Sequence, residues 1–283
     1  MDSTARVPLD FALIAAISSG IIWGITPSLY SEASREGGSI RANFWKSLGA
    51  FSLMVPICYV SGSLLIPPPM GLFYIAANMA LGAGLADYSF LKAIGLIGPG
   101  RATSIGFTYV VWTALLSSLL LKEPLTPFTL AGTLLAVAGI WLISYQGGRW
   151  LIKGLLLSIL ASLGWSLSPI AAKLALEYVN ELTTTLWNSL MATSIYGILS
   201  HPRYRVKGLK KATFGGLLGI GVGLPLYYFA VKVVGVTIAT LATALGPPTS
   251  QIAAHLSGDR ITARDIVGSL LVALGLALSV MRG

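Results

Sequence analysis

Long apolar stretches with almost no charged residues alternate with short polar connections along this 283-residue sequence. A helix needs roughly 17 to 25 residues to cross about 30 Å of hydrocarbon. Eight stretches reach this length without an Asp, Glu, Lys or Arg. Two more are imperfect, because Met70–Phe90 contains Asp87 and Ile266–Met281 is short unless it begins near Ile261. The pattern therefore predicts ten membrane-spanning helices. The charge-free stretches are Phe11–Tyr30, Ser47–Ile66, Ala102–Leu121, Pro124–Gln146, Gly154–Ala172, Leu182–Ser200, Ala212–Val231 and Val233–Gly258.

The connections between these stretches are short and rich in turn residues, such as Pro67-Pro68-Pro69 and Gly98-Pro99-Gly100. None is long enough to form a second domain. Because lipid offers no hydrogen bonds, each spanning segment must satisfy its own backbone, as a helix does. The polar and apolar alternation typical of a membrane barrel is absent. The predicted fold class is an all-α membrane protein with ten transmembrane helices.

The composition indicates an exterior that faces lipid. Hydrophobic residues make up 55% of the chain and charged residues only 10%, against roughly 25% charged residues in soluble domains. The net charge of +9 would suggest nucleic acid as a partner of a soluble protein. Here we expect the basic residues to hold helix ends at one membrane face, with the bilayer as partner and no nucleic acid. With one cysteine and no Cys/His pair at ligand spacing, we expect no metal and no cofactor.

An internal repeat divides the sequence into two similar halves. The segment W-G-I-T-P from Trp23 to Pro27 matches W-S-L-S-P from Trp165 to Pro169. W-K-S-L at 45–48 matches W-N-S-L at 187–190 with the same offset. Further on, the offset shortens in two small steps, a change that loops absorb easily. These later matches pair Tyr88, Lys92 and Gly95 with Tyr228, Lys232 and Gly235, and Glu123, Thr126, Gly132 and Gly139 with Asp259, Thr262, Gly268 and Gly275.

The two repeats are predicted to have opposite orientations in the membrane. The first repeat spans residues 1–146 and the second 147–283, and each holds five predicted helices. Because five is odd, the second repeat enters the membrane from the opposite face. Inverted repeats recur in secondary transporters, where rocking of one half against the other alternately exposes a midplane site. The sequence therefore favours transport by alternating access.

In the order and spacing of these motifs, the chain resembles the drug/metabolite transporter superfamily, in particular its EamA-type members. The shared features are a W-x-x-x-P first helix, a Tyr and a Lys at the end of the third, and an acidic turn followed by G-x6-G in the fifth. The resemblance implies a central cavity lined by the first, third, fourth, sixth, eighth and ninth helices, and export or exchange of small metabolites. One departure is that Pro247-Pro248 in the ninth helix align with Val111 and Trp112 in the fourth, which argues against symmetric flexing of these two helices.

The distribution of basic residues predicts which face lies outside. With ten spans, fourteen Lys and Arg residues fall on one face and five on the face that carries both termini. Since cytoplasmic loops hold the excess of Lys and Arg, both termini are predicted to lie outside the cell. Members of the family are usually drawn with both termini in the cytoplasm, so the two arguments disagree. The expected location is the plasma membrane.

Asp87 is the main candidate for chemistry because a carboxylate inside the membrane must be paired, hydrated or protonated. One hypothesis is that Asp87 titrates and binds a proton or the amino group of a substrate. The alternative is a structural ion pair, with Lys46, Lys92 or Arg101 as the partner.

Prolines and polar residues inside the spans are further candidates. Pro27, Pro169, Pro247 and Pro248 are predicted hinges, although a packing kink without substrate contact is the alternative. A polar stripe on the ninth helix ends at His255, which is either a proton relay or a hydrogen-bonded residue at the interface. The predicted substrate-binding residues are Trp23, Thr26, Asn78, Asp87, Tyr88, Tyr109, Trp112, Trp165, Ser168, Tyr227, Tyr228, Thr243 and Gln251.

A secondary transporter for amino acids or similar amphipathic molecules is the leading interpretation. A membrane-embedded enzyme would need clustered Asp, Glu or His residues, and a channel would need rings of like side chains or a carbonyl filter. No phosphate-binding Gly-Lys-Ser/Thr loop is present to use ATP. The glycines at 215, 219 and 223 allow close helix contact, which we assign to packing within one chain, so a monomer is expected.

Overall fold

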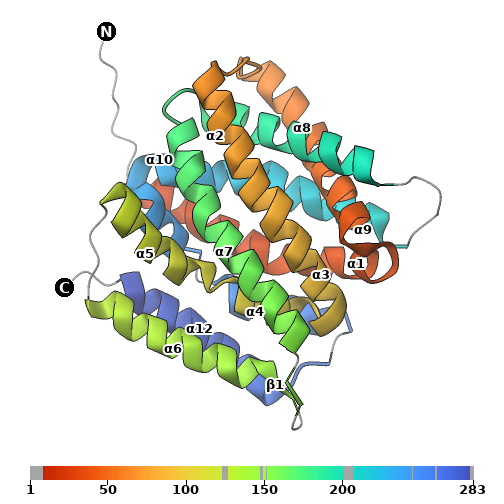
Figure 1. The fold of residues 1–283 in the computed structure, drawn as a ribbon, viewed down its shortest axis with the longest axis vertical. Coiled ribbons are helices and arrows are strands. Elements are labelled where there is room, and N and C mark those ends of the chain that lie inside the picture. Colours follow the sequence, from red (N-terminus) through yellow and green to blue (C-terminus); the bar gives the residue numbers. More distant parts are fainter. Residues whose placement is uncertain are drawn as a thin grey trace.

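The computed structural model describes residues 9–122, 127–146, 149–150, 152–200, 207–243, 245–258 and 260–280, and almost all of them are helical (Figure 1). A two-residue antiparallel pair, β1 (Tyr145–Gln146) and β2 (Arg149–Trp150), joins the halves. The helical elements are α1 (Leu9–Val60), α2 (Pro69–Met79), η1 (Ala80–Asp87), α3 (Tyr88–Ile97), α4 (Pro99–Gly106), α5 (Tyr109–Leu121), α6 (Pro127–Ser144), α7 (Ile152–Ala175), α8 (Glu181–Leu199), α9 (Leu209–Gly216), η2 (Leu217–Val222), α10 (Gly223–Leu241), α11 (Gly246–Leu256) and α12 (Ala263–Val280).

Several helices are long and apolar enough to cross a membrane, which makes the chain a multi-pass membrane protein. Among the described residues, five uninterrupted or nearly uninterrupted helical runs meet both criteria. Each run contains an 18-residue stretch with at most two charged side chains, as expected because an unpaired charge in hydrocarbon is costly. These runs are Leu9–Val60, Pro69–Ile97, Pro99–Leu121, Ile152–Ala175 and Leu209–Leu241.

Three glycines turn the chain between helical segments with the same backbone conformation. Gly38 within α1, Gly98 before α4 and Gly235 within α10 have φ of 76°, 82° and 85° and ψ of 165°, 160° and 169°. This region of φ and ψ is open almost only to glycine. The sequence alignment paired Gly95 with Gly235, but the structure gives Gly98 the matching turn. The spacing from Gly98 to Gly235 is intermediate between the offsets of the repeat matches that precede and follow it in the sequence.

Two of the predicted spans are broken at matching places. The fourth span separates into α4 and α5, and the ninth, predicted as one helix over Val233–Gly258, separates into the end of α10 and α11. At each break a threonine hydroxyl donates to the carbonyl three residues earlier, from Thr108 to Ile105 at 2.7 Å and from Thr243 to Thr240 at 2.6 Å. The backbone N–H of each threonine makes the same 3₁₀-type bond. The fourth span therefore breaks without a proline, which removes the reason to expect the two helices to differ.

Two π-helical segments, η1 and η2, interrupt the third and eighth predicted spans. Both segments are rich in glycine, with Gly82 and Gly84 in η1 and Gly219 and Gly221 in η2. A π-helical turn leaves backbone carbonyls away from their usual α-helical partners and is frequent at functional sites. The matching places of η1 and η2 mark the third and eighth spans as structural counterparts.

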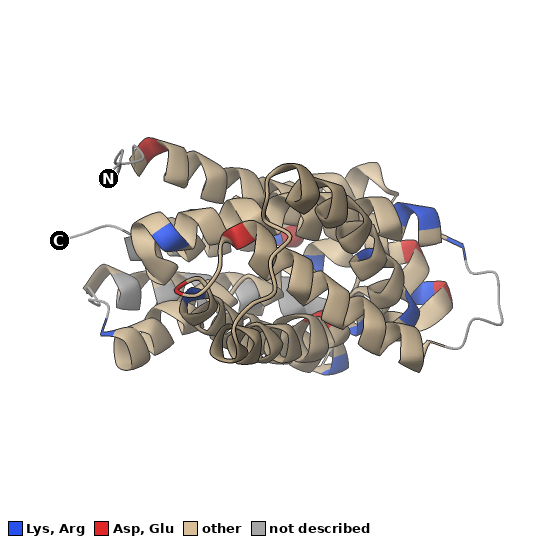
Figure 2. Ribbon diagram, turned by 90° about the horizontal axis from the view of Figure 1, so that it is seen from above, with Lys and Arg blue, Asp and Glu red and all other residues tan. Residues whose placement is uncertain are grey.

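The longest helix, α1, contacts helices of both repeats, and the last helices of the two repeats lie at the edge of the bundle. α1 contacts α3, α8, α9, α10, α11 and η2. α6 and α12 lie side by side at the lower edge of Figure 1, where a Cβ atom on Gly139 would stand 2.5 Å from the Gly268 carbonyl oxygen. Figure 2 shows most Lys and Arg positions toward one end of the bundle.

Candidate functional site

A cavity of about 130 Å³ lies where the two halves of the chain meet. Its wall comes from α1, α2 with η1, α3, the connection between α4 and α5, α5, α7, α8, η2 and α10. At roughly 10–15 Å³ for each water molecule, the space corresponds to about ten waters. It therefore suits a small molecule rather than a polymer. The lining residues are Trp23, Thr26, Pro27, Tyr30, Lys46, Asn78, Gly82, Ala83, Asp87, Phe90, Phe107, Tyr109, Trp165, Ser168, Pro169, Asn188, Gly219, Ile220, Leu224, Tyr227 and Tyr228.

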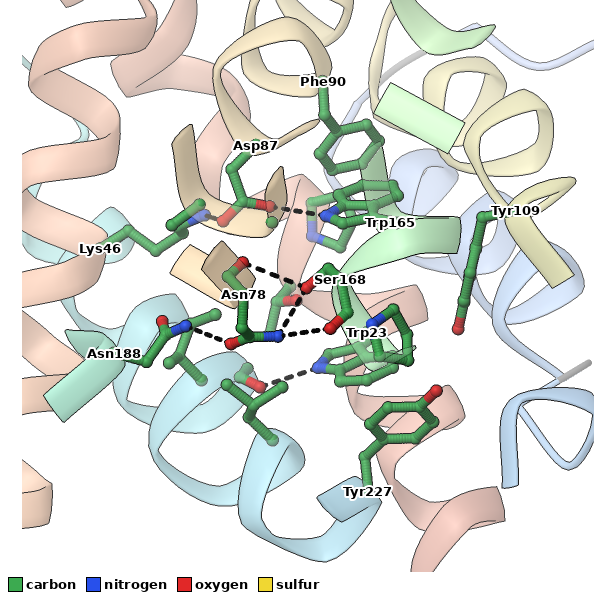
Figure 3. A pocket seen from close by; sticks show the side chains of 18 of the residues that line it. Trp23, Lys46, Asn78, Asp87, Phe90, Tyr109, Trp165, Ser168, Asn188 and Tyr227 are labelled. Atoms are coloured by element: carbon green, nitrogen blue, oxygen red, sulfur yellow. Dashed lines mark hydrogen bonds and ion pairs between the residues drawn. The ribbon is translucent and has the colours of Figure 1, made fainter. Parts of the chain in front are cut away.

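A buried ion pair between Lys46 and Asp87 forms one side of the cavity (Figure 3). Lys46 is 3% exposed and Asp87 is 7% exposed. The Asp87 carboxylate also accepts the indole N–H of Trp165 at 3.0 Å, and the Lys46 ammonium lies 5.7 Å from the centroid of the Tyr30 ring. The pair cancels its own charge, but removing one partner would leave the other charge buried, which typically costs about 3–5 kcal/mol.

The structure selects among the three partners considered for Asp87. Lys46 contacts it, whereas Lys92 is exposed and lies 5.5 Å from the centroid of the Tyr88 ring. Arg101 instead pairs with Asp265, with its Nε 2.7 Å from a carboxylate oxygen. Because the Lys46–Asp87 pair borders the cavity, the structural and functional interpretations of Asp87 are compatible.

Asn78 is the centre of a hydrogen-bonded cluster on a second side of the cavity (Figure 3). Its amide nitrogen donates to the backbone oxygen and to the hydroxyl of Ser168, both at 2.8 Å. Its amide oxygen accepts from Asn188 and, at 2.8 Å, from the Tyr228 hydroxyl. These bonds use both donors and both acceptor positions of the Asn78 amide, so this one side chain ties α2 to α7, α8 and α10.

The two tryptophans paired by the repeat face the cavity and reach across to the opposite half (Figure 3). Trp23 of the first half donates its indole N–H to the Gly219 carbonyl of η2 at 2.8 Å. Trp165 of the second half donates to Asp87, the last residue of η1. Each π-helical segment is therefore held by a tryptophan from the other repeat.

Aromatic rings cover the apolar part of the wall. The ring centroids of Trp23 and Tyr227 are 5.1 Å apart, and those of Phe90 and Trp165 are 4.7 Å apart in an edge-to-face arrangement. The ring centroid of Tyr109 lies 6.1 Å from that of Trp165. Such rings bind apolar groups and the faces of cations. The cavity thus offers charge, amide hydrogen bonds and aromatic surface to one ligand.

Most of the predicted site residues line this cavity, and two of the four predicted hinge prolines do. Pro27 and Pro169 belong to the lining, whereas Pro247 and Pro248 stand in the first turn of α11. The predicted binding residues found in the lining are Trp23, Thr26, Asn78, Asp87, Tyr109, Trp165, Ser168, Tyr227 and Tyr228.

The other predicted residues lie elsewhere. Tyr88 is half-buried beside Lys92, Trp112 is 40% exposed, and His255 is exposed near the end of α11. Thr243 is buried behind the wall, where its hydroxyl is 3.0 Å from that of Tyr109. Gln251 lines a separate pocket. Helical spacing predicts that the polar stripe of the ninth span lies on one helix face. Because the span breaks before α11, Thr243 packs against Tyr109, Gln251 lines the separate pocket and His255 is exposed.

Other lining residues were not predicted as binding residues. Tyr30, Phe90 and Phe107 gave no signal because aromatic residues are common throughout the spans. Lys46 was considered only as a partner for Asp87, and Asn188 only as a marker of the repeat. The repeat could have found both, since they are polar residues at equivalent positions of the W-K-S-L and W-N-S-L segments, within apolar sequence. Within the described part of the chain, no group of three His, Cys, Asp or Glu side chains could hold a metal ion.

The described residues form long apolar helices in two similar halves, with a small cavity and a buried ion pair between them. This arrangement is typical of a membrane transport protein. The sequence model of the EamA-like transporter family matches residues 10–145 and again residues 152–281. The chain therefore belongs to the EamA-like transporter family, which confirms the resemblance seen in the sequence.

Comparisons with individual proteins give further, weaker similarities. An uncharacterized transporter of Archaeoglobus fulgidus is 19% identical over 272 residues, which cover 94% of this chain and 96% of that protein. Protein LicB of Haemophilus influenzae is 39% identical over 75 residues, only 26% of this chain and 25% of LicB. One crystal structure has a TM-score of 0.69 at 16% identity and covers 95% of this chain and 96% of its own, which supports the fold alone.

Proposed function

We propose that this protein is a secondary active transporter that moves a small amphipathic metabolite, such as an amino acid, across the plasma membrane by alternating access. The observation that carries the proposal is the cavity between the halves, where equivalent residues of both repeats face one space. Trp23 and Trp165 line it, as do Pro27 and Pro169. A site shared by two repeats is what alternating access requires, because each half can open it to one side.

The proposal includes ten spans in two inverted repeats, with both termini on one face. The turns at Gly38 and Gly235 divide α1 and α10, so that each contributes to two successive spans. In this assignment some spans contain breaks, which membrane helices tolerate where neighbouring helices or polar side chains satisfy the backbone. The ten spans are residues 9–37, 39–60, 69–97, 99–121, 127–144, 152–175, 181–199, 209–234, 236–256 and 263–280.

The moving parts are proposed to be the broken fourth and ninth spans. The break in the fourth span contacts α7 through the Thr108 and Ser162 hydroxyls, 3.0 Å apart. The break in the ninth span packs against α1, where a Cβ on Gly20 would stand 2.6 Å from the Thr243 Cα. Gly20 and Ser162 are separated by the same offset as Trp23 and Trp165, so they occupy equivalent positions of the repeat. These equivalent contacts support a pair of gates that open in turn.

A zwitterion fits the charges of the cavity. The Asp87 carboxylate can accept hydrogen bonds from a substrate ammonium, and the Lys46 ammonium can donate to a substrate carboxylate. The substrate would then replace the internal ion pair with two new pairs and leave no net charge buried. The aromatic rings around Trp23 and Trp165 would receive its apolar side chain. The same carboxylate is the proposed site of proton coupling, since a proton and a substrate ammonium would compete for Asp87.

Counterflow in proteoliposomes tests the proposed function. Vesicles loaded with an unlabelled amino acid should accumulate the labelled one transiently, whereas a channel or an enzyme gives no such overshoot. Asp87→Asn should abolish counterflow, and Glu177→Gln, which removes an exposed carboxylate, should leave it intact. If Asp87→Asn retains counterflow and loses only uptake driven by a pH gradient, Asp87 serves proton coupling alone. Unchanged transport in both assays would remove Asp87 from the mechanism.

A further inference from the structure

A second pocket, of about 390 Å³, shares no residue with the central cavity. It lies where α1, the turn between α3 and α4, α11 and the segment leading into α12 meet. We call it the arginine pocket because Arg35, Arg101 and Arg260 all line it. Its only acidic lining residue among the described residues is Asp265. The described lining thus carries three guanidinium groups and one carboxylate.

Asp265 is already fully engaged with neighbouring protein groups. Arg101 donates two parallel hydrogen bonds to its carboxylate, at 2.7 and 2.9 Å. The backbone N–H and the hydroxyl of Thr262 each donate to the same carboxylate at 2.8 Å. Asp265 thus orients Arg101. The two hydrogen bonds to the Asp265 carboxylate use two of the five N–H donors of the Arg101 guanidinium.

Gln251 supplies an unsatisfied polar atom in the same pocket. The side chain is 3% exposed, and its amide nitrogen donates to the Ser104 hydroxyl at 3.3 Å. The amide oxygen is buried and has no hydrogen-bond partner in the protein. A Cβ atom at Gly100 would stand 2.5 Å from this oxygen, so the oxygen packs closely against Gly100, which also lines the pocket. A buried acceptor without a partner costs about 1–3 kcal/mol, which a donor on a ligand would recover.

We propose that the arginine pocket binds a phosphate ester that carries a neighbouring hydroxyl group. The guanidinium groups would bind the phosphate, since their planar donors match its oxygens. The hydroxyl would donate to the amide oxygen of Gln251. This chemistry has two sources, a free ester such as glycerol 3-phosphate or the headgroup of phosphatidylglycerol at the membrane face. The proposal is independent of the transported substrate, because the pocket shares no residue with the central cavity.

Titration calorimetry of the purified full chain tests the phosphate half of the proposal. Glycerol 3-phosphate is titrated into protein in uncharged detergent. For the lipid, the protein is placed in nanodiscs of phosphatidylglycerol or phosphatidylcholine, and its Tm is compared between the two. The double variant Arg35→Gln/Arg260→Gln should weaken the apparent Kd by at least about tenfold, equivalent to about 1.4 kcal/mol. The control Lys207→Gln/Lys210→Gln removes the same charge from exposed residues outside the pocket and should bind as the parent chain does. Stabilisation by phosphatidylglycerol without binding of the free ester would identify the lipid as the source.

A second comparison tests the hydroxyl half. Methyl phosphate lacks the hydroxyl, so the parent chain should prefer glycerol 3-phosphate over it, and Gln251→Leu should lose this preference while still binding both anions. If glycerol 3-phosphate does not bind the parent chain and phosphatidylglycerol does not stabilise it, the proposal is overturned. It is also overturned if the arginine variant and the lysine control bind equally, which would show a general effect of surface charge.

Discussion

Trp23 and Trp165 occupy equivalent positions of the two repeats and donate their indole N–H groups to π-helical segments of opposite halves. The two bonds differ in their acceptors. Trp23 meets the Gly219 carbonyl, whereas Trp165 meets the charged carboxylate of Asp87. The repeat therefore keeps the geometry in both halves but places an ionised acceptor in only one.

We expect Trp165→Phe to destabilise the protein more than Trp23→Phe does. Phe retains an aromatic ring and loses the donor in each case. A neutral hydrogen bond contributes about 0.5–1.5 kcal/mol and one to a charged group about 1.5–3 kcal/mol. Thermal unfolding in detergent measures the difference, at about 2–4 °C for each kcal/mol lost. Equal shifts in Tm would show that the charge on Asp87 does not strengthen the Trp165 bond.

The Lys46–Asp87 pair should show strong coupling in a double-mutant cycle. Lys46→Met or Asp87→Asn alone should each lower stability by about 3–5 kcal/mol, because a buried charge loses its partner. The double variant should be less destabilised than the sum of the two single variants. Lys92→Met is the matched control, since Lys92 is exposed outside the cavity. Additive losses would indicate that the two side chains do not pair in the folded protein.

The turn at Gly98 gives a prediction that separates backbone strain from packing. Gly98→Ala should lower stability by about 1–3 kcal/mol, because its φ of 82° and ψ of 160° are closed to residues with a Cβ. Gly95→Ala, three residues earlier within α3, should be neutral or stabilising, since its Cβ would meet only the Ser34 backbone, 3.6 Å from the oxygen. Thermal unfolding of both variants compares them directly. A larger loss for Gly95→Ala would contradict the assignment of Gly98 as the counterpart of Gly235.

The orientation in the membrane can be read from cysteine labelling. In a Cys58→Ser background, Ser61→Cys samples the connection between α1 and α2, and Lys210→Cys samples the start of α9. Both positions are exposed. If the face rich in Lys and Arg is cytoplasmic, an impermeant thiol reagent should modify Ser61→Cys in intact cells and leave Lys210→Cys unmodified. If Lys210→Cys is modified and Ser61→Cys is not, both termini lie in the cytoplasm, which is the orientation usually drawn for the family.

The sequence predicted the class of protein and much of the cavity because both depend on simple regularities. The length of the apolar stretches predicts membrane helices. The repeat pairs Trp23 with Trp165 and Thr26 with Ser168 in the sequence, and all four residues line the cavity between the halves. Thr243, Gln251 and His255 lie outside the lining of this cavity, because helical spacing assumes an unbroken helix and the ninth span breaks before α11. The π-helical segments carry no sequence signal beyond their glycines. Each π-helical segment accepts a hydrogen bond from a tryptophan in the other half of the chain. Only the folded structure brings these residues near one another.

Asn78 has a further consequence for how the molecule works. Because its amide has no unused donor or acceptor, a ligand cannot bind it without displacing Ser168, Asn188 or Tyr228. In the proposed transport cycle, a ligand that binds Asn78 would therefore break one of the hydrogen bonds that tie α2 to α7, α8 or α10. Asn78 would thus couple the binding of substrate to the loosening of contacts between these helices.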